Sequence, residues 1–476
     1  MKKKKIIIVG AGPGGLTAGM LLANQGFAVE IFEKNSDVGG RNGAIVKNGF
    51  TFDIGPTFLM MKPVLDEVFA EAGEKTTDYL EFYDLDPMYR LIFKNNFIDI
   101  SRHAAKTRAE IKRVFPGEEK GFDKLMIREK KRFDYAYPCL QQNYSKFYNL
   151  FNSHLLRFLP KLSFPNSMHK ELGKYFKNED LKMAFTFQSK YLGMSPWQCP
   201  AAFMIIPFIE HHYGIYHVKG GLSEISQAMK KVILKKGGKF HFNANVKNVT
   251  GTTIILENKE KHCADEIIIN ADVGYAYKKL LKKKDLTSKK FSCSTFMLYL
   301  GLKKNVDLEH HTVFFSDNYK KYVDSIFKGM ALDDDISFYI RNATKYDKTV
   351  APTGKGNIYV LVPVPNNKSK IDWSKIKTAF RDKLIAKMKE KTGIDFEELI
   401  ETEIIITPDD WENKYNVFLG ATFNLAHNLT QMLYFRPHNQ LEKHLFLVGG
   451  GTNPGSGLPT IYESGRIVAK IIAKTQ

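Results

Sequence analysis

The chain of 476 residues contains only four cysteines, and no two of them form a C-x-x-C pair. Histidines at the spacing of metal ligands are also missing. These absences exclude a cysteine-bound zinc site, a redox dithiol and a disulfide framework. We therefore expect reduced thiols and no metal site; the cysteines are Cys139, Cys199, Cys263 and Cys293.

Long apolar runs are absent as well. No window approaches the roughly 18 apolar residues that a membrane-spanning helix requires. The basic stretch Met1–Lys5 precedes only four apolar residues before the first glycine, too few for the hydrophobic part of a signal peptide. We expect a cytoplasmic protein whose contact with a membrane, if it has one, is peripheral.

Acidic residues are scarce relative to basic ones, with 51 against 70 and a net charge of +19. Such an excess indicates nucleic acid, an anionic membrane or an anionic ligand as a partner, although scattered lysines also occur where the genome favours them. No helix-turn-helix, zinc finger or RNA-binding motif is found. An anionic membrane surface is therefore the expected partner, and nucleic acid is not. The length predicts two or three domains.

The first 33 residues are typical of half a dinucleotide-binding site. Their parts are, in order, a buried strand, a G-x-G-x-x-G turn, a helix, a second strand and an acid, at Ile6–Val9, Gly10–Gly15, residues 16–25, residues 27–32 and Glu33. The strand, helix and acid around the glycines make this a stronger indication than an isolated glycine motif.

Each part of this segment has a physical task. Gly10 permits the tight turn, Gly12 lets the backbone approach a pyrophosphate, and Gly15 lets helix and strand pack closely. The helix N-terminus offers free amides and the positive end of its dipole to phosphates. Glu33 is placed to accept hydrogen bonds from ribose hydroxyls.

Glycine-rich strand ends recur in the middle and at the end of the chain. The middle segment is predicted to contain a helix at 222–235, a strand at 239–249 with a hairpin partner at 253–257, and a buried strand before Asn270. The last segment has a strand at 445–448, glycines and a terminal helix to Ala473. The pattern predicts an α/β fold with a nucleotide-binding domain formed by residues 1–75, 215–290 and 420–476.

Two long segments separate these parts. Residues 60–215 read as helical, aromatic and lysine-rich, and we assign 76–214 to a helical segment. Residues 291–419 read as β-rich, with strands at 295–302, 312–316 and 358–363 and a helix at 375–391.

The motifs resemble those of the flavin-containing amine oxidoreductase superfamily, and within it the carotenoid desaturases of the bacterial and fungal phytoene desaturase type. The resemblance extends over nearly the whole chain. The stretches F-R-P-H-N and H-H-T-V-F-F are more particular to the desaturases than the rest. The motifs lie at residues 8–16, 38–41, 52–57, 294–301, 310–315, 359–365, 431–439 and 455–459.

The resemblance implies non-covalently bound FAD in a Rossmann-like domain built from the three segments. It also implies an inserted α+β substrate domain, with 291–419 as its β-rich part and 76–214 as a helical part that contacts substrate and membrane. The implied cofactor-binding residues are Gly10, Ala11, Gly12, Pro13, Gly14, Gly15, Glu33, Gly39, Gly40, Arg41, Gly55, Pro56, Val246, Asn270, Gly450, Gly457, Leu458 and Pro459.

Gly39, Gly40 and Arg41 would follow the pyrophosphate and the ribityl chain by this resemblance. Arginine suits phosphate because its planar fork donates two hydrogen bonds; the alternative is a solvated surface arginine. Val246 would pair its backbone with adenine. The helix beginning near Pro459 would direct amides at the N1/O2 edge of the flavin, and this second glycine cluster favours FAD over NAD(P).

The implied substrate is a long acyclic polyene such as phytoene or its C30 counterpart. Residues 146–161 alternate apolar and basic side chains at helical spacing, as in an interfacial helix on anionic lipid. A second apolar run, Cys199–Ile209, could line a tunnel or meet the membrane. An ordinary core-facing helix is the alternative for both.

No catalytic base can be named from the sequence. His310, His311, Arg436 and His438 stand in family motifs but are expected to be structural, and Glu463 with Arg466 is expected to form an ion pair. Asn453 stands where many desaturases carry histidine, so a carotenoid oxidase, a cis–trans isomerase or a saturase remains open. An amine oxidase and a flavin-binding lipid carrier are less favoured, and the oligomeric state is left open.

Overall fold

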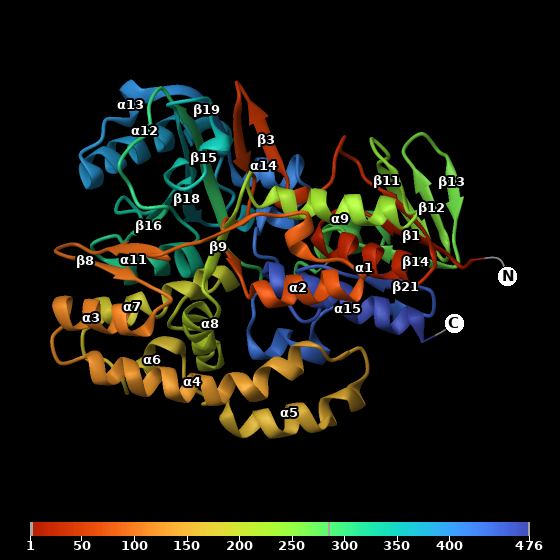
Figure 1. Ribbon diagram of the computed structural model, residues 1–476, viewed down its shortest axis with the longest axis horizontal. Helices are drawn as coiled ribbons and strands as arrows, with labels where there is room; N and C mark the ends of the chain where they lie inside the picture. The colour runs from red at the N-terminus through yellow and green to blue at the C-terminus, as the bar shows by residue number, and fades with distance from the viewer. Residues whose placement is uncertain (1–2, 284–285, 475–476) are drawn as a thin grey trace.

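The computed structural model describes residues 3–283 and 286–474; Met1 and Lys2 of the basic N-terminal run lie outside them. Its first sheet has six strands in the order β10-β2-β1-β14-β21-β20, parallel except for β20. Strands from three distant parts of the chain thus share one sheet (Figure 1). The strands are β1 (Lys5–Val9), β2 (Ala28–Phe32), β10 (Lys239–His241), β14 (Glu266–Ile269), β20 (Gln440–Glu442) and β21 (Leu445–Leu447).

Alternate side chains of β1 face different layers. Ile6 and Ile8 pack in one core with the helices, whereas Ile7 and Val9 pack in another with a small antiparallel sheet. Figure 1 shows these helices gathered on one side of the six-stranded sheet. They are α1 (Pro13–Asn24), α2 (Lys62–Glu71), α9 (Ser223–Lys235) and α15 (Leu458–Ala473), and the small sheet consists of β11 (Val246–Thr250), β12 (Thr253–Leu256) and β13 (Lys261–Cys263).

A seven-stranded sheet forms the other half, in the order β19-β15-β18-β17-β16-β7-β8. Its strands β7 and β8 come from the segment predicted to be helical, and β7 pairs in parallel with β16. The helical expectation for residues 60–215 is therefore wrong for residues 82–100. The strands are β7 (Tyr89–Ile92), β8 (Phe97–Ile100), β15 (Ser294–Leu302), β16 (His311–Phe314), β17 (Phe338–Asn342), β18 (Gly356–Val364) and β19 (Ile400–Ile406).

The single strand predicted at 239–249 is also wrong. The chain turns after β10, where Asn243 has a φ of 53° and the Ala244 amide donates to the Glu33 carbonyl at 2.9 Å. β10 therefore stays in the six-stranded sheet and β11 enters the small sheet. The turn brings Val246 back toward the end of β2.

Helices of the 104–213 region lie together along one edge of the molecule, in orange and yellow in Figure 1. The one helix predicted at 146–161 is instead three short pieces, Phe147–Phe151, α5 (Ser153–Phe158) and Leu159–Lys161. Asn152 causes the break, because its side chain caps α5 by accepting from the Leu155 amide at 2.9 Å. The region's other helices are α3 (Ala104–Val114), α4 (Glu119–Leu140), α6 (Met168–Leu172), α7 (Glu179–Ala184) and α8 (Ile205–Tyr213).

Smaller elements connect the two halves. Within the described ranges, no helix combines the length and the apolar character needed to cross a membrane. The remaining strands are β3 (Ala44–Lys47), β4 (Phe50–Asp53), β5 (Leu59–Met60), β6 (Phe82–Asp84) and β9 (Ile215–Val218), and the remaining helices are α10 (Val273–Tyr275), α11 (Tyr319–Asp324), α12 (Trp373–Thr392), α13 (Phe396–Leu399) and α14 (Pro408–Asn413).

Candidate functional site

A cavity of about 420 Å³ extends from the six-stranded sheet to the seven-stranded sheet. At one end it meets the carboxyl ends of β1, β2, β14 and β21, through Val9, Phe32, Asn270 and Val448. Ligands of open α/β sheets bind at this edge.

The glycine turn after β1 has no room for side chains. Gly10 has a φ of +97°, and a Cβ added to it would lie 2.8 Å from the Asn270 carbonyl oxygen. A Cβ on Gly15 would lie 2.6 Å from the Gly10 carbonyl oxygen. Helix α1 begins after Gly12 without a side-chain cap, so the first free amides of the helix are available to a ligand.

Glu33 lies buried beside this turn and lines the cavity. Its carboxylate accepts from the Ala11 amide at 2.7 Å and from the Asn35 amide at 2.9 Å. A carboxylate has about four lone-pair sites, so both oxygens retain capacity for ribose hydroxyls. The ribose contact remains a prediction.

Arg41 lines the cavity and faces Asp272 from across it. Its Nη1 donates to the Thr422 carbonyl at 2.7 Å. With the amide of Asn424 oriented to satisfy both neighbours, that residue accepts from Arg41 Nη2 at 3.1 Å and donates to Asp272 Oδ2 at 2.7 Å. Burial lowers the pKa of Arg41 although Asp272 opposes the shift, and burial raises the pKa of Asp272 although Arg41 opposes it. A guanidinium group is thus held in place at the wall of the cavity by Thr422 and Asn424.

The second glycine cluster closes the cavity at another point. Helix α15 begins after Gly457, whose φ is +114° and which provides no side-chain cap. Arg436 holds the preceding turn by donating to the carbonyls of Gly450 at 2.7 Å, Thr452 at 3.0 Å and Gln431 at 3.4 Å. Burial lowers the pKa of Arg436 to about 9. The sequence did not reveal this supporting role.

All of the predicted cofactor residues line the cavity except Ala11, Gly15 and Gly39. These three residues lie outside the cavity lining and support the glycine turn after β1. The Gly39 amide donates to the Ala11 carbonyl at 2.8 Å, and Gly39 has a φ of +113°.

The cavity fits FAD by its own geometry. Two uncapped helix N-termini, of α1 and α15, meet the same cavity, and the Arg41 guanidinium lines it as well. An extended dinucleotide with two phosphates and a ring at each end needs this arrangement, and a mononucleotide does not. A dinucleotide such as FAD therefore fits this cavity.

Apolar side chains from the seven-stranded sheet and its surroundings line the rest of the cavity. We call this part the apolar chamber; it is formed by Phe58, Met60, Phe187, Val313, Phe338 and Leu361. Of its strands, β16 and β18 were predicted and β17 was not, and the sequence did not indicate which of their faces meets the cavity. The period-2 alternation of a half-buried strand is absent from β16 and β18, because both are buried on nearly every position.

The histidines of the family motifs lie outside the cavity lining. His311 Nδ1 lies 2.7 Å from the Tyr339 hydroxyl, and His438 Nε2 lies 2.9 Å from the Tyr434 carbonyl oxygen. Burial holds the pKa of His310 and of His311 well below the ordinary value. The predicted ion pair of Glu463 with Arg466 is confirmed at 2.6 Å.

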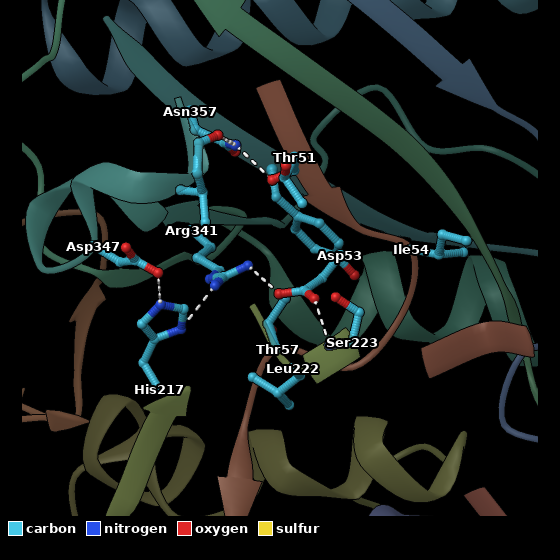
Figure 2. A network of polar contacts seen from close by, with 12 residues as sticks. Thr51, Asp53, Ile54, Thr57, His217, Leu222, Ser223, Arg341, Asp347 and Asn357 are labelled. Carbon is cyan, nitrogen blue, oxygen red and sulfur yellow. Dashed lines mark hydrogen bonds and ion pairs between the residues drawn. The ribbon is translucent and has the colours of Figure 1, made fainter. Parts of the chain in front are cut away.

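A buried polar network connects elements from both halves of the molecule (Figure 2). Arg341 donates to Asp53 Oδ2 at 2.7 Å and to His217 Nδ1 at 2.9 Å. His217 Nδ1 is therefore the acceptor, and Nε2 carries the hydrogen shared with Asp347 at 2.9 Å. Burial would raise the pKa of Asp347, but hydrogen bonds from His217 and Thr349 outweigh it and lower that pKa. Asp53 belongs to a motif found in the sequence; its partners were not foreseen.

The chain is similar to proteins of known family. The model of a family described as "Flavin containing amine oxidoreductase" matches residues 13–473. The 4,4'-diapophytoene desaturase (4,4'-diapolycopene-forming) of Methylomonas sp is 48% identical, with 99% of this chain and 95% of the relative covered. The zeta-carotene-forming phytoene desaturase of Myxococcus xanthus is 37% identical, with 98% and 93% covered. The cyclohexylamine oxidase from Brevibacterium oxydans superposes with a TM-score of 0.62 over 100% of this chain and 99% of that one; at 14% identity this likeness is one of fold.

Proposed function

The chain belongs to the flavin containing amine oxidoreductase family, and we propose that within it the chain is an FAD-dependent carotenoid desaturase acting on a long acyclic polyene. The observation that carries the proposal is a single cavity with a dinucleotide-binding end and an apolar chamber. An elongated hydrocarbon lying in that chamber would reach the cofactor without crossing water. The identity with two desaturases over almost the whole chain supports the same reaction.

The cofactor supplies the hydride acceptor when bound, and the chain supplies position and environment. Amides at the start of α1 and the Arg41 guanidinium would hold the phosphates, and Glu33 the ribose. Amides at the start of α15 would face the flavin. The apolar chamber would align the polyene and exclude water, which suits a substrate without polar groups.

The helical region would contact an anionic membrane peripherally, where such a substrate is dissolved. It exposes several large apolar side chains within 147–164, together with Lys146 and Lys161, and such a group of exposed apolar and basic side chains in one region is typical of an interfacial surface. The run Cys199–Ile209 is not part of that surface, because its apolar side chains are mostly buried. The exposed residues are Phe147, Tyr148, Phe151, Leu156, Leu159 and Phe164.

Asn453 offers little support for a different reaction. Its side chain is fully buried behind the second glycine turn and donates to the Leu433 carbonyl at 3.0 Å. The replacement of histidine at this position therefore changes the support of the turn and not the lining of the cavity. Oxidase, isomerase and saturase activities are outcomes of the test below.

The test is pigment chromatography of cells that make phytoene or diapophytoene and express this chain. We expect a product with a longer conjugated system. An aldehyde would indicate an oxidase, a product of unchanged conjugation an isomerase, and a product with a shorter conjugated system a saturase. The control is Gly15→Val, whose side chain would collide with the Gly10 carbonyl and prevent cofactor binding. Purified protein whose flavin stays oxidised under anaerobic conditions with every polyene would overturn the proposal.

A further inference from the structure

Lys190 is a cationic side chain at the apolar end of the cavity. It belongs to the short 3-10 helix Phe187–Leu192. No carboxylate among the described residues pairs with it. Its Nζ instead lies over aromatic rings, 4.9 Å from the Tyr319 centroid, 5.8 Å from that of Tyr322 and 5.9 Å from that of Phe315.

The helix that carries Lys190 is attached to the second glycine cluster. The Leu192 carbonyl accepts from His427 Nδ1 at 3.3 Å, and His427 Nε2 accepts from the Ser456 amide at 3.1 Å. Gly193 packs so closely on Ser292 that no Cβ would fit there. The helix that carries Lys190 thus provides Phe187 to the apolar chamber and is linked through His427 to Ser456 of the second glycine cluster, and both of these residues line the cavity.

The other titratable groups that line the cavity either have hydrogen-bond or charge partners or are tyrosines with a raised pKa. Glu33 holds two backbone amides, and Asp272 faces Arg41. Lys34 donates to the Lys414 carbonyl at 2.7 Å. Burial raises the pKa of each lining tyrosine, which are Tyr275, Tyr339, Tyr359 and Tyr415. Among the described lining residues, Lys190 is left as the amine available to a substrate.

We propose that Lys190 is the catalytic base of the desaturation. This rests on the proposed function. With FAD bound as the hydride acceptor, one carbon of the polyene would lose a hydride, and the neighbouring carbon would lose a proton to the uncharged amine of Lys190. The electrons of the second C–H bond become the new π bond, and the amine becomes an ammonium that later returns its proton to solvent.

The surroundings of Lys190 suit both states of the amine. Burial lowers its pKa to about 8. Burial raises the pKa of the facing groups Cys293, Tyr319 and Tyr322, so none of them is an anion that would retain the ammonium. The aromatic rings then stabilise the charge after proton transfer, since cation–π contacts contribute roughly 0.5–2 kcal/mol.

Turnover of the FAD-loaded enzyme against pH tests the role. We expect the wild-type kcat to rise through an apparent pKa near 8. Lys190→Met should lower kcat by roughly 10²–10⁴-fold, the usual contribution of a general base, and abolish this pH dependence. Lys190→Arg keeps the charge and cannot accept the proton, so it should be as slow. KM should change little in both variants.

A second measurement does not depend on activity. The ¹⁵N spectrum of lysine-labelled protein should contain an amine signal that titrates near pH 8 and is missing from Lys190→Met. The matched control is Lys320→Met, because the Lys320 ammonium also lies over an aromatic ring, Trp197 at 5.6 Å, but outside the cavity. This control should retain wild-type kcat and the signal.

The possible failures are separable. If the wild type desaturates and Lys190→Met retains kcat within threefold, or Lys190→Arg retains the wild-type pH profile, Lys190 is not the base. The same conclusion follows if no amine titrates below pH 9. If the wild type converts no polyene while the amine titrates near 8, the proposed function fails, and the role of Lys190 fails with it.

Discussion

Two buried arginines hold this molecule together in different ways. Arg341, 2% exposed, has a carboxylate partner in Asp53 and a second acceptor in His217. Arg436, 1% exposed, has only backbone carbonyls as acceptors among the described residues. The first connects β4 and β17, which belong to different sheets, and the second supports one turn.

The two arginines therefore differ in role. Arg341 belongs to a buried ion pair, whereas Arg436 places a positive charge next to a turn of the backbone. A buried pair of opposite charges is neutral as a unit, so removal of one member leaves an uncompensated charge. Arg436 leaves no opposite charge behind, and its positive charge stays next to the Gly449–Gly451 turn that lines the cavity. Arg341 should therefore matter most for folding, and Arg436 for the cofactor.

The largest effect is expected from Arg341→Met. It leaves the Asp53 carboxylate buried without a counter-charge, which costs about 3–5 kcal/mol of the free energy of unfolding. Urea unfolding of the FAD-loaded chain measures this loss. The double variant Asp53→Asn with Arg341→Met should be less destabilised than Arg341→Met alone, since the stranded charge is gone. A loss below 1 kcal/mol for the single variant would remove the distinction drawn between the two arginines.

Arg436→Met should have a smaller effect on stability and a clear one on the cofactor. Three carbonyls lose a charged donor, at a cost of about 1–3 kcal/mol. The turn at Gly450 then loosens, and FAD should dissociate more readily, as the fluorescence of released flavin would report. Arg436→Lys keeps the charge but lacks the several N–H donors of the guanidinium, so it should restore FAD retention only in part. Wild-type FAD retention in Arg436→Met would contradict the assignment.

The dinucleotide half of the fold could be predicted because its signals are local. β1, the glycine turn, α1 and β2 follow one another within 33 residues, and each boundary lies within three residues of the expected one. The second cluster at Gly449–Pro459 is equally local. Its support by Arg436 depends on backbone carbonyls, which leave no pattern in a sequence.

The rest depends on contacts between distant segments. Asp53 and Arg341 are 288 positions apart, and no spacing rule connects them. The strands β7 and β8 were missed although β8 alternates exposed and buried residues, because helical lysine-rich sequence surrounds this short hairpin. Lys190 could not be distinguished from surface lysines, since only the packing of Tyr319 and Phe315 against it defines its environment.

The smallest effect concerns acid, and it compares the histidines beside the two arginines. An added proton on His217 would go to Nδ1, which accepts from Arg341, and the Asp347 carboxylate at Nε2 would offset its charge in part. A proton on His427 would add a second positive charge beside Arg436 and break the hydrogen bond from the Ser456 amide. Burial, reinforced by Arg436, holds the pKa of His427 well below its ordinary 6.5. Below pH 6.5, the unfolded chain therefore binds a proton at His427 that the folded chain does not bind. The stability that His427 contributes above pH 6.5 is lost as the pH falls.

Between pH 7.0 and 5.5 this loss is about 1 kcal/mol for one such histidine. His427→Asn should reduce the acid-induced loss of unfolding free energy by that amount, measured with urea at the two pH values. The control is His154→Asn, the same substitution at an exposed position on α5, and it should leave the acid-induced loss as in the wild type. If His427→Asn leaves the difference between the two pH values as in the wild type, the folded protein accepts a proton beside Arg436. The charge of that arginine would then be compensated by a group of the loaded protein, and the contrast with Arg341 would disappear.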